Sequence, residues 1–235
     1  MIELSIHELL PCFPEFRVAI VVAENLRLAR ERPARLDALI ADREQACRAR
    51  WSGKELSEIP GIAAWRAAYK GFGIKKTSYR SSVERLVKRV KAGERLPAVN
   101  TLVDIYNAVS LTYVFCCGAD DLDRLAPPLA FRFARAGDSF ADMGAQAGED
   151  PNDPPKAGEV VYADSRHVLC RRWNWRQDAR TGISEATRRA VITVQANGWG
   201  DLDAATADLK RLAAQFCGAS ARSAVADAAA PRIAL

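Results

Sequence analysis

The sequence is poor in the residues that metal sites and disulfide frameworks require. Histidine occurs only as His7 and His167 in 235 residues, and none of the six cysteines belongs to a Cys-x-x-Cys pair. Structural zinc sites normally combine closely spaced Cys and His ligands, so the sequence predicts neither a metal site nor a bound cofactor. We interpret the cysteines as buried or idle thiols, because a disulfide framework is unusual in a chain this long without a secretion signal.

Long apolar runs are also missing. A helix needs about 20 consecutive apolar residues to cross a bilayer, and no stretch of this chain approaches that length. The first six residues lack the basic start and the apolar core of a secretory signal. We therefore predict a cytoplasmic protein that has no contact with a membrane.

Positive charge, in contrast, is concentrated in one segment. Residues 66–95 hold ten Lys and Arg against two Glu, whereas the whole chain has a net charge of +5. Such a segment on a near-neutral body is typical of a polyanion-binding face, and the alternative is a loop solvated by its lysines. The residues that we predict to contact RNA here are Lys70, Lys75, Lys76, Tyr79, Arg80, Lys88 and Arg89.

Apolar spacing divides the chain into a helix-rich first half and a strand-rich second half. Helical spacing covers residues 35–51, 59–69, 100–112 and 203–216, and a basic helix opens near Ser81 or Ser82, with Ser82 as its N-cap, and ends at Gly93. Strand patterns occupy residues 2–6, 16–23, 113–117, 130–134, 159–163, 167–172 and 187–195. This segregation favours an α+β fold. Residues 219–235, rich in Ala and Ser, are predicted to be a disordered tail.

A row of polar residues follows one side of the predicted helix at 100–112. Asn100, Asp104, Asn107 and Ser110 recur at spacings of four, three and three. Asn and Ser are mediocre helix formers, so the row requires a reason. One reason is structural, through capping and bonds to neighbouring loops. The other is a polar face that orients a ligand such as a ribose or an aminoacyl group.

The window 171–177 combines two tryptophans with three arginines. On a strand, Trp173 and Trp175 would share one face, and Asn174 and Arg176 would share the other. Trp beside Arg can stack on a base and bind a phosphate. We predict a substrate pocket formed by Trp173, Asn174, Trp175, Arg176 and Tyr106, and the alternative is a pair of core tryptophans with an exposed arginine rim.

Several separate segments, in the same order, resemble the B3/B4 domain of the bacterial phenylalanyl-tRNA synthetase beta chain. They are residues 96–107, which run from Leu-Pro to Tyr-Asn, and residues 121–125 and 159–169. Residues 70–75, 78–82 and 172–177 are similar to segments of free-standing members of the family. The resemblance covers residues 64–197.

The resemblance implies an α+β fold with a mainly antiparallel β-sheet packed with helices. It implies one B3/B4-like domain over residues 1–218, on which residues 1–60 pack as an N-terminal extension. It also implies a pocket that hydrolyses tyrosine wrongly attached to a phenylalanine tRNA. Gly118 stands where the synthetases carry a histidine, so the specificity for tyrosine does not transfer to this chain.

The resulting hypothesis is a free-standing protein, not a complete synthetase, that binds the acceptor end of a tRNA and hydrolyses mischarged aminoacyl-tRNA in trans. Asn100, Asp104, Asn107 and Ser110 would line its catalytic pocket, with Asn107 orienting the ester or the water. Two alternatives remain open. One is an RNA-binding module without catalysis, and the other is a protein that binds or hydrolyses a free amino-acid derivative.

Overall fold

The structure, a computed structural model, describes residues 1–74, 79–145, 148, 150 and 152–235. Its helices are α1 Ala34–Arg50, α2 Pro60–Gly71, α3 Ser82–Lys91, α4 Thr101–Tyr113 and α5 Leu202–Cys217, with short 3-10 helices at Leu56–Glu58 and Leu122–Arg124. Its strands are β1 Glu3–Ser5, β2 Phe16–Glu24, β3 Cys116–Asp121, β4 Leu129–Phe133, β5 Val160–Ala163, β6 Val168–Arg171, β7 Arg176–Gln177, β8 Ala190–Asn197, β9 Ser220–Ala226 and β10 Arg232–Ala234.

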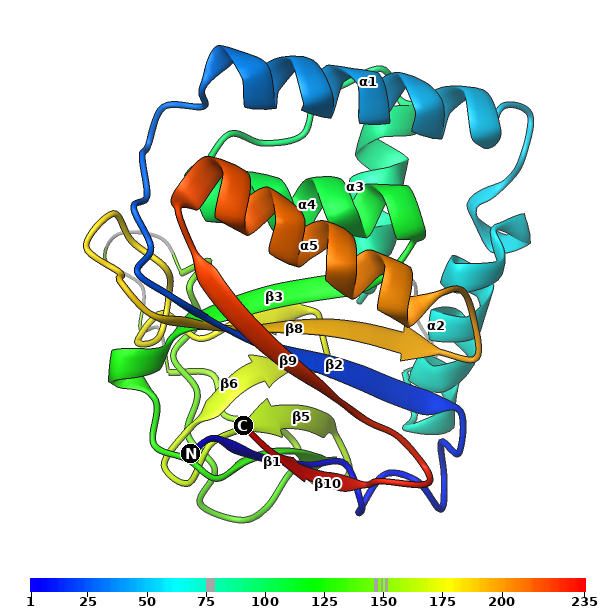
Figure 1. The fold of residues 1–235 in the computed structure, drawn as a ribbon. Coiled ribbons are helices and arrows are strands. Elements are labelled where there is room, and N and C mark those ends of the chain that lie inside the picture. Colours follow the sequence, from blue (N-terminus) through cyan, green and yellow to red (C-terminus); the bar gives the residue numbers. More distant parts are fainter. Residues whose placement is uncertain (75–78, 146–147, 149, 151) are drawn as a thin grey trace.

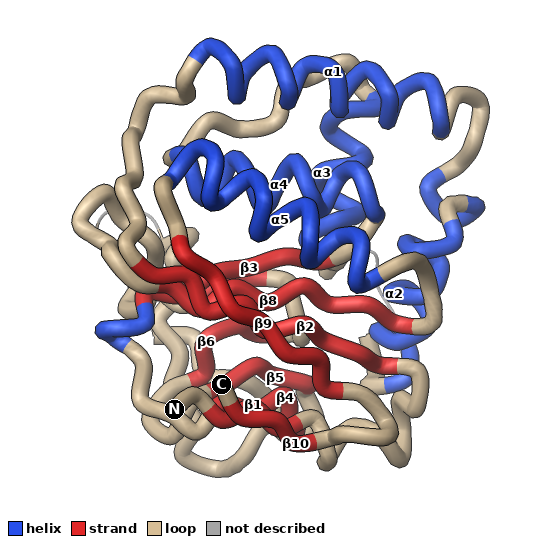
Figure 2. The backbone as a smooth tube through the Cα atoms, in the orientation of Figure 1, coloured by secondary structure: helices blue, strands red, loops and turns tan. Residues whose placement is uncertain are grey.

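The strands form two sheets, and the α+β class predicted from the sequence is confirmed. One sheet has the order β3-β8-β2-β9 and the other β10-β1-β4-β5-β6-β7, and within the described residues only the β1–β4 pair is parallel. Helices α4 and α5 lie over one face of the first sheet, α1 crosses above them, and the second sheet lies on the other side (Figure 1). Figure 2 shows the same separation of helices from strands. In the described part of the chain no helix is both long and apolar enough to cross a bilayer.

The main core covers both faces of the first sheet, and its part between the two sheets is rich in aromatic side chains. Phe16 of β2 packs edge-on against Phe131 of β4, with ring centroids 5.2 Å apart. Trp65 of α2 and Trp173 add two more fully buried rings beside Phe16. Burial of these large apolar surfaces is the main free-energy gain of folding, and it holds the two sheets together.

Helix starts follow local capping chemistry. Ser81 caps α3, because its hydroxyl accepts a hydrogen bond from the Glu84 N–H. The prediction that Ser82 is the N-cap was therefore wrong by one residue. Asn100 caps α4 by accepting a hydrogen bond from the Val103 N–H at 3.0 Å.

The strand predicted at residues 113–117 is displaced toward the C-terminus. Helix α4 continues through Tyr113 and ends at Val114, whose φ of 60° turns the chain out of the helix. Strand β3 then begins at Cys116 and runs to Asp121. Gly118 lies in the middle of this strand rather than in a connecting loop.

The C-terminal residues form strands, so the prediction of a disordered tail was wrong. Strand β9 pairs with β2 from Val18↔Ala226 to Glu24↔Ser220, and β10 pairs with β1. Main-chain pairing stabilises this segment although its Ala and Ser side chains bury little apolar surface. Residues 1–60 likewise contribute strands to both sheets, with β2 between β8 and β9, instead of packing outside a finished domain.

Candidate functional site

A cavity of about 630 Å³ lies at the border of the two sheets and is lined by residues of α3, α4, β3, β6, β7 and β8. Gly118 is paired with Thr193 and Cys116 with Gln195, so Gly118, Asp120, Thr193 and Gln195 share one face of the first sheet. Val18 of β2 pairs with Gln195, so Val18 and Phe16, two residues earlier, lie on this same face. It is the face that packs against the second sheet, because Phe16 contacts Phe131 of β4. At this part of the face toward the second sheet, apolar core side chains give way to one glycine and three polar residues.

Asp120 is the buried acid of the cavity. Its Oδ1 accepts hydrogen bonds from Thr181 Oγ1 at 2.6 Å and from Gln177 Nε2 at 2.9 Å. The pKa of Asp120 is raised to about 7, mainly by burial and to a smaller extent by the nearby carboxylates Asp178 and Asp164, although the hydrogen bonds from Thr181 and Gln177 act to lower it. Within the described residues Oδ2 accepts no hydrogen bond, so it can take a proton or a donor from a ligand.

Further polar groups line the same cavity. Asn174 accepts a hydrogen bond from the Tyr69 hydroxyl at 3.0 Å and donates one to Gln195 at 3.2 Å, and Gln195 donates to Thr193 at 3.1 Å. The hydroxyl of Tyr162 is buried and has no hydrogen-bond partner in the described part of the chain. A buried group of this kind costs free energy unless a water or a ligand pairs with it. The cavity therefore has unused hydrogen-bonding capacity.

Strand β3 is an edge strand, and its outer main-chain groups face the cavity. Asp121 donates its N–H to the Thr181 carbonyl at 2.8 Å, and the Ala119 carbonyl accepts from the Gln177 side chain. Because main-chain groups alternate along a strand, the N–H groups of Cys117 and Ala119 also point away from β8. Among the described residues neither donates to a group outside the sheet. They form two free donors at the cavity wall.

The rim of the cavity is basic and centred on Trp175. Arg85 of α3 donates to the Trp175 carbonyl at 3.0 Å. The guanidinium of Arg172 lies 3.8 Å from the Tyr79 ring centroid and 4.4 Å from that of Trp175, and the guanidinium of Arg176 lies 4.8 Å from the Trp175 centroid. These cation–π contacts hold the indole in a defined position at the mouth.

A smaller hollow of about 350 Å³ adjoins this mouth along α3. It shares Arg85, Arg89 and Trp175 with the cavity and adds Arg80 and Lys88. The side chain of Lys88 is exposed there. The two hollows are neighbours that share these three lining residues, and the smaller one also includes Glu94, which pairs with Arg89 at 3.0 Å.

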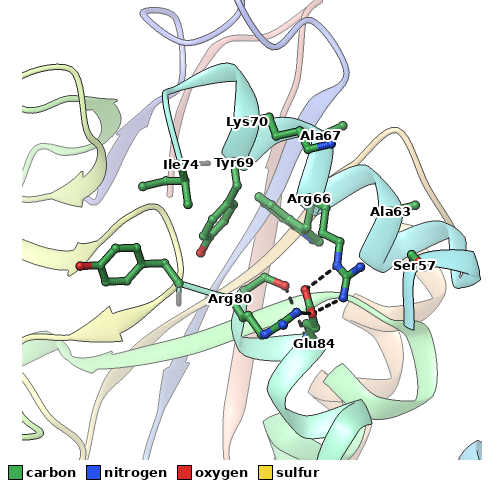
Figure 3. A pocket seen from close by; sticks show the side chains of 12 residues that line it. Ser57, Ala63, Arg66, Ala67, Tyr69, Lys70, Ile74, Arg80 and Glu84 are labelled. Carbon is green, nitrogen blue, oxygen red and sulfur yellow. Dashed lines mark hydrogen bonds and ion pairs between the residues drawn. The ribbon is translucent and has the colours of Figure 1, made fainter. Parts of the chain in front are cut away.

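A third hollow, of about 470 Å³, separates α2 from the start of α3 and is shown in Figure 3. Buried Glu84 is one of its lining residues and binds both Arg66, at 2.7 Å, and Arg80. Arg80 is therefore tied to Glu84, although a single carboxylate shared by two arginines leaves this cluster with a net positive charge. Lys70 lines this hollow and is exposed. Lys75 and Lys76, also predicted to bind RNA, lie outside the described residues.

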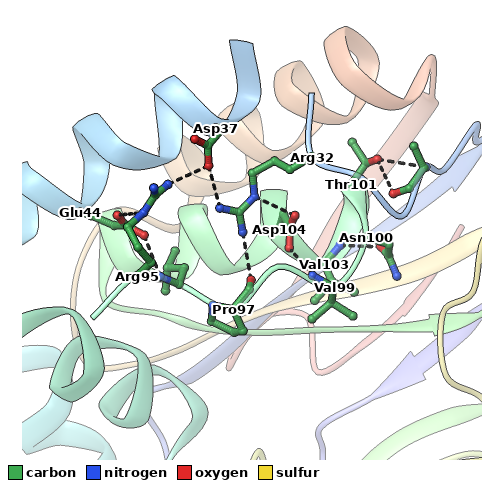
Figure 4. Close-up of polar contacts among 12 residues, drawn as sticks. Arg32, Asp37, Glu44, Arg95, Pro97, Val99, Asn100, Thr101, Val103 and Asp104 are labelled. Atoms are coloured by element: carbon green, nitrogen blue, oxygen red, sulfur yellow. Dashed lines mark hydrogen bonds and ion pairs between the residues drawn. The ribbon is translucent and has the colours of Figure 1, made fainter. Parts of the chain in front are cut away.

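The polar row on α4 has several partners instead of one ligand-facing surface. Asn100 is used as the N-cap, and Asp104 is fully buried and bound to Arg32 at 2.9 Å (Figure 4). The hydroxyl of buried Ser110 donates to the Phe115 carbonyl. Only Asn107 of the row lines the cavity, together with its neighbour Tyr106. Asn100, Asp104 and Ser110 therefore have structural roles, in capping and in bonds to neighbouring segments.

Trp173 does not form a pocket wall with Trp175. Residues 172–175 are a turn between β6 and β7, with positive φ at Arg172 (45°) and Trp173 (66°), so strand alternation does not apply. Trp173 is fully buried in the core, with centroids 4.8 Å from Phe13 and 5.3 Å from Trp65. Of the predicted pocket residues, the cavity includes Tyr106, Asn174, Trp175 and Arg176.

Sequence reasoning missed the acidic and amide floor of the cavity. Asp120 and Gln177 are 57 residues apart and meet only because β7 lies beside the free edge of β3. One signal was present in the sequence: an acidic pair, Asp120 and Asp121, follows an otherwise apolar run at the end of a predicted strand. Arg85, counted in the basic segment, was not singled out for the site.

Comparison with known proteins gives three findings. A family model described as the B3/4 domain matches residues 64–198. Among solved structures, the chain is similar to an N-terminal fragment of the phenylalanyl-tRNA synthetase beta-subunit from Pyrococcus horikoshii, at 15% sequence identity and a TM-score of 0.48. That similarity covers 94% of this chain and 50% of the fragment, so the chain spans half of its length. A comparison with curated proteins gives no match.

Proposed function

Because this chain belongs to the B3/4 domain family, as its separate sequence segments indicated, we propose that it binds the acceptor end of a tRNA and hydrolyses the ester of a wrongly attached amino acid. The observation that carries this proposal is the distribution of charge across the cavity. Its rim has Arg85 together with Arg89 and Arg176, which are paired with Glu94 and Asp142, whereas its floor has Asp120.

An aminoacyl-adenosine has the complementary distribution. Its phosphates are anionic, its ribose and ester are neutral, and its amino group is cationic. Phosphates at the basic rim and an ammonium group near Asp120 would each meet opposite charge, which favours one orientation of the ligand. The volume of about 630 Å³ is in the range of small-molecule sites, so the cavity can enclose the terminal residue of a tRNA.

Trp175 and the hollow along α3 fit the single-stranded end of a tRNA. The Trp175 indole offers a surface for base stacking, which is tolerant of sequence. Arg85, Lys88 and Arg89 lie along the adjoining hollow and can bind phosphates, which contributes affinity without base specificity. The strand would thus pass over Trp175 and place its last nucleotide in the cavity.

The floor of the cavity has the groups that ester hydrolysis needs. The carboxylate of Asp120 can accept a proton from water, and an ammonium group of the substrate beside it favours the ionised form that a base needs. Water then bonds to the ester carbonyl carbon, its proton passes to Asp120, the bond to the ribose oxygen breaks, and that oxygen takes up the proton. The N–H of Cys117 or that of Ala119, neither of which has an acceptor among the described residues, can donate a hydrogen bond to the carbonyl oxygen and so stabilise its negative charge. The amide of Asn107 orients the ester.

A deacylation screen tests the proposal. A panel of tRNAs, each charged correctly or incorrectly with a radiolabelled amino acid, is incubated with the protein, with Asn107→Ala and with Asp120→Asn. Arg211→Ala, on the exposed side of α5, is the control that removes a charge far from the cavity. We expect selective release by the wild type and the control, and little release by the two cavity variants.

The screen also separates the other two functions. No release above the spontaneous rate, with salt-sensitive tRNA binding intact, would leave an RNA-binding module and reject hydrolysis. Binding that does not depend on salt, together with turnover of a free amino-acid ester, would reject the role of tRNA.

A further inference from the structure

Gly118 lies in the middle of β3 and points into the cavity. It is paired with Thr193, and among the described residues it is the only glycine inside a strand. A Cβ atom added at Gly118 would have no heavy atom within 4 Å. The space beyond its Cα is therefore open and belongs to the cavity, of which Gly118 is a lining residue.

The backbone does not require a glycine here. Gly118 has no positive φ, unlike Gly200 and Gly218, so any residue can adopt its conformation. A glycine inside a strand weakens it and often marks a place where a ligand comes close to the main chain. A missing side chain that lowers stability and faces a cavity suggests that part of a ligand occupies the space beside Gly118.

The groups around this space also indicate a ligand. Thr193 faces Gly118 across the strand pair, and Leu169 and Tyr106 supply apolar surface to the same cavity. The buried Tyr162 hydroxyl, which has no partner in the described residues, lines it as well. On either side of Gly118, the N–H of Cys117 or that of Ala119, neither of which has an acceptor among the described residues, can donate to a carbonyl oxygen. A carbonyl bound there lies next to the open space.

We propose that Gly118 determines which amino acids the cavity accepts, because the side chain of the ester-linked amino acid fills the space that Gly118 leaves open. The substrates are then tRNA esters of amino acids with large side chains. This inference rests on the proposed function, since it names the substrate class of the same site. Small side chains would leave the space unfilled and bind less well.

The test fills the space in two steps, with Gly118→Ala and Gly118→Val. Ala221→Val, on strand β9 at the opposite edge of the same sheet, adds similar bulk far from the cavity and serves as the control. Each protein is assayed on one tRNA charged with phenylalanine, tryptophan or leucine, and on the same tRNA charged with alanine or glycine. We expect Gly118→Val to lower kcat/KM for the large side chains by at least about 10-fold and to spare the small ones.

Two further measurements keep the outcome interpretable. Thermal unfolding should show no loss of Tm in Gly118→Ala, because the added Cβ meets no atom. Binding of stable 3′-amide analogues of aminoacyl-adenosine, by calorimetry, reports the same preference without hydrolysis. A preference for large side chains that disappears in Gly118→Val supports the inference even if no ester is hydrolysed, which would reject only the catalytic function. Identical side-chain profiles for the wild type and Gly118→Val, in either assay, overturn the inference.

Discussion

Arg32 donates a hydrogen bond from Nε to Oδ2 of Asp104 at 2.9 Å, which joins the segment before α1 to the first turns of α4 (Figure 4). The other oxygen of Asp104 accepts from the Val99 N–H at 3.0 Å, and Arg32 also donates to the Pro97 carbonyl. Both side chains are nearly inaccessible to solvent. The most polar residue of α4 therefore fixes the approach to the helix and has no access to a ligand.

Asp104→Ala should destabilise the protein. Loss of the carboxylate leaves the Arg32 guanidinium with weaker compensation in a buried site, and breaking such a pair costs about 3–5 kcal/mol. Denaturant unfolding measures the loss. Asn107→Ala on the same helix is the comparison, and it should change stability little while it abolishes deacylation. A stable Asp104→Ala protein without activity would contradict a purely structural role for Asp104.

Asp120 should make stability fall as pH rises. Its pKa is about 7 in the folded protein against 3.8 as the ordinary value, so between these limits the folded state keeps a proton that the unfolded chain releases. The stabilising contribution is complete below about pH 4 and is lost by about pH 7. A shift of this size corresponds to a change on the order of 4 kcal/mol. Unfolding free energies of the wild type minus those of Asp120→Asn, across pH 4 to 8, isolate the effect; a flat difference would contradict it.

The two neighbouring tryptophans should respond differently to truncation. Trp173→Ala removes a fully buried ring and should cost about 3–5 kcal/mol of stability. Trp175→Ala removes a half-buried ring at the rim, so the fold should persist, while tRNA binding weakens by about 1–3 kcal/mol if a base stacks there. Unfolding and filter-binding assays on both variants separate the roles. Unchanged tRNA affinity in Trp175→Ala would argue against stacking.

Lys88→Ala should reduce the salt dependence of tRNA binding. Lys88 is exposed in the hollow along α3, and each lost phosphate contact lowers the slope of log K against log salt concentration by about 0.7 to 0.9. Arg211→Ala removes one charge from α5 and should leave the slope unchanged. Equal slopes in the wild type and both variants would exclude this hollow from the phosphate path.

Local patterns predicted the helices and most strands, because spacing of apolar residues and capping act over a few positions. Where local patterns gave the wrong secondary structure, the conformation depends on contacts with residues far away in the sequence. Residues 220–226 form a strand because β2 offers a free edge, which their own composition does not reveal. Trp173 and Trp175 point apart because Arg172 and Trp173 adopt positive φ in a turn, a conformation that the sequence window does not indicate.

The candidate site could be predicted only in part for the same reason. Asn107 and Asn174 were predicted within their segments, and both line the cavity. The Asp120–Gln177 contact forms only because β7 of the second sheet lies beside β3 of the first. No pattern in the sequence near either residue indicates this contact. Asp104 and Ser110 were predicted as site residues because spacing identifies one side of a helix but does not identify what covers it.

The outer edge of β3, where the N–H groups of Cys117 and Ala119 have no acceptor among the described residues, makes hydrogen exchange along this strand uneven. The amides of Gly118 and Asp120 are held by β8, whereas those of Cys117 and Ala119 face the cavity. Deuterium uptake in the absence of a ligand should therefore alternate from one residue to the next, fast at 117 and 119 and slow at 118 and 120. A ligand that accepts hydrogen bonds from this edge should slow deuterium uptake at residues 117 and 119. The exchange rates of these two amides therefore report whether the cavity is occupied.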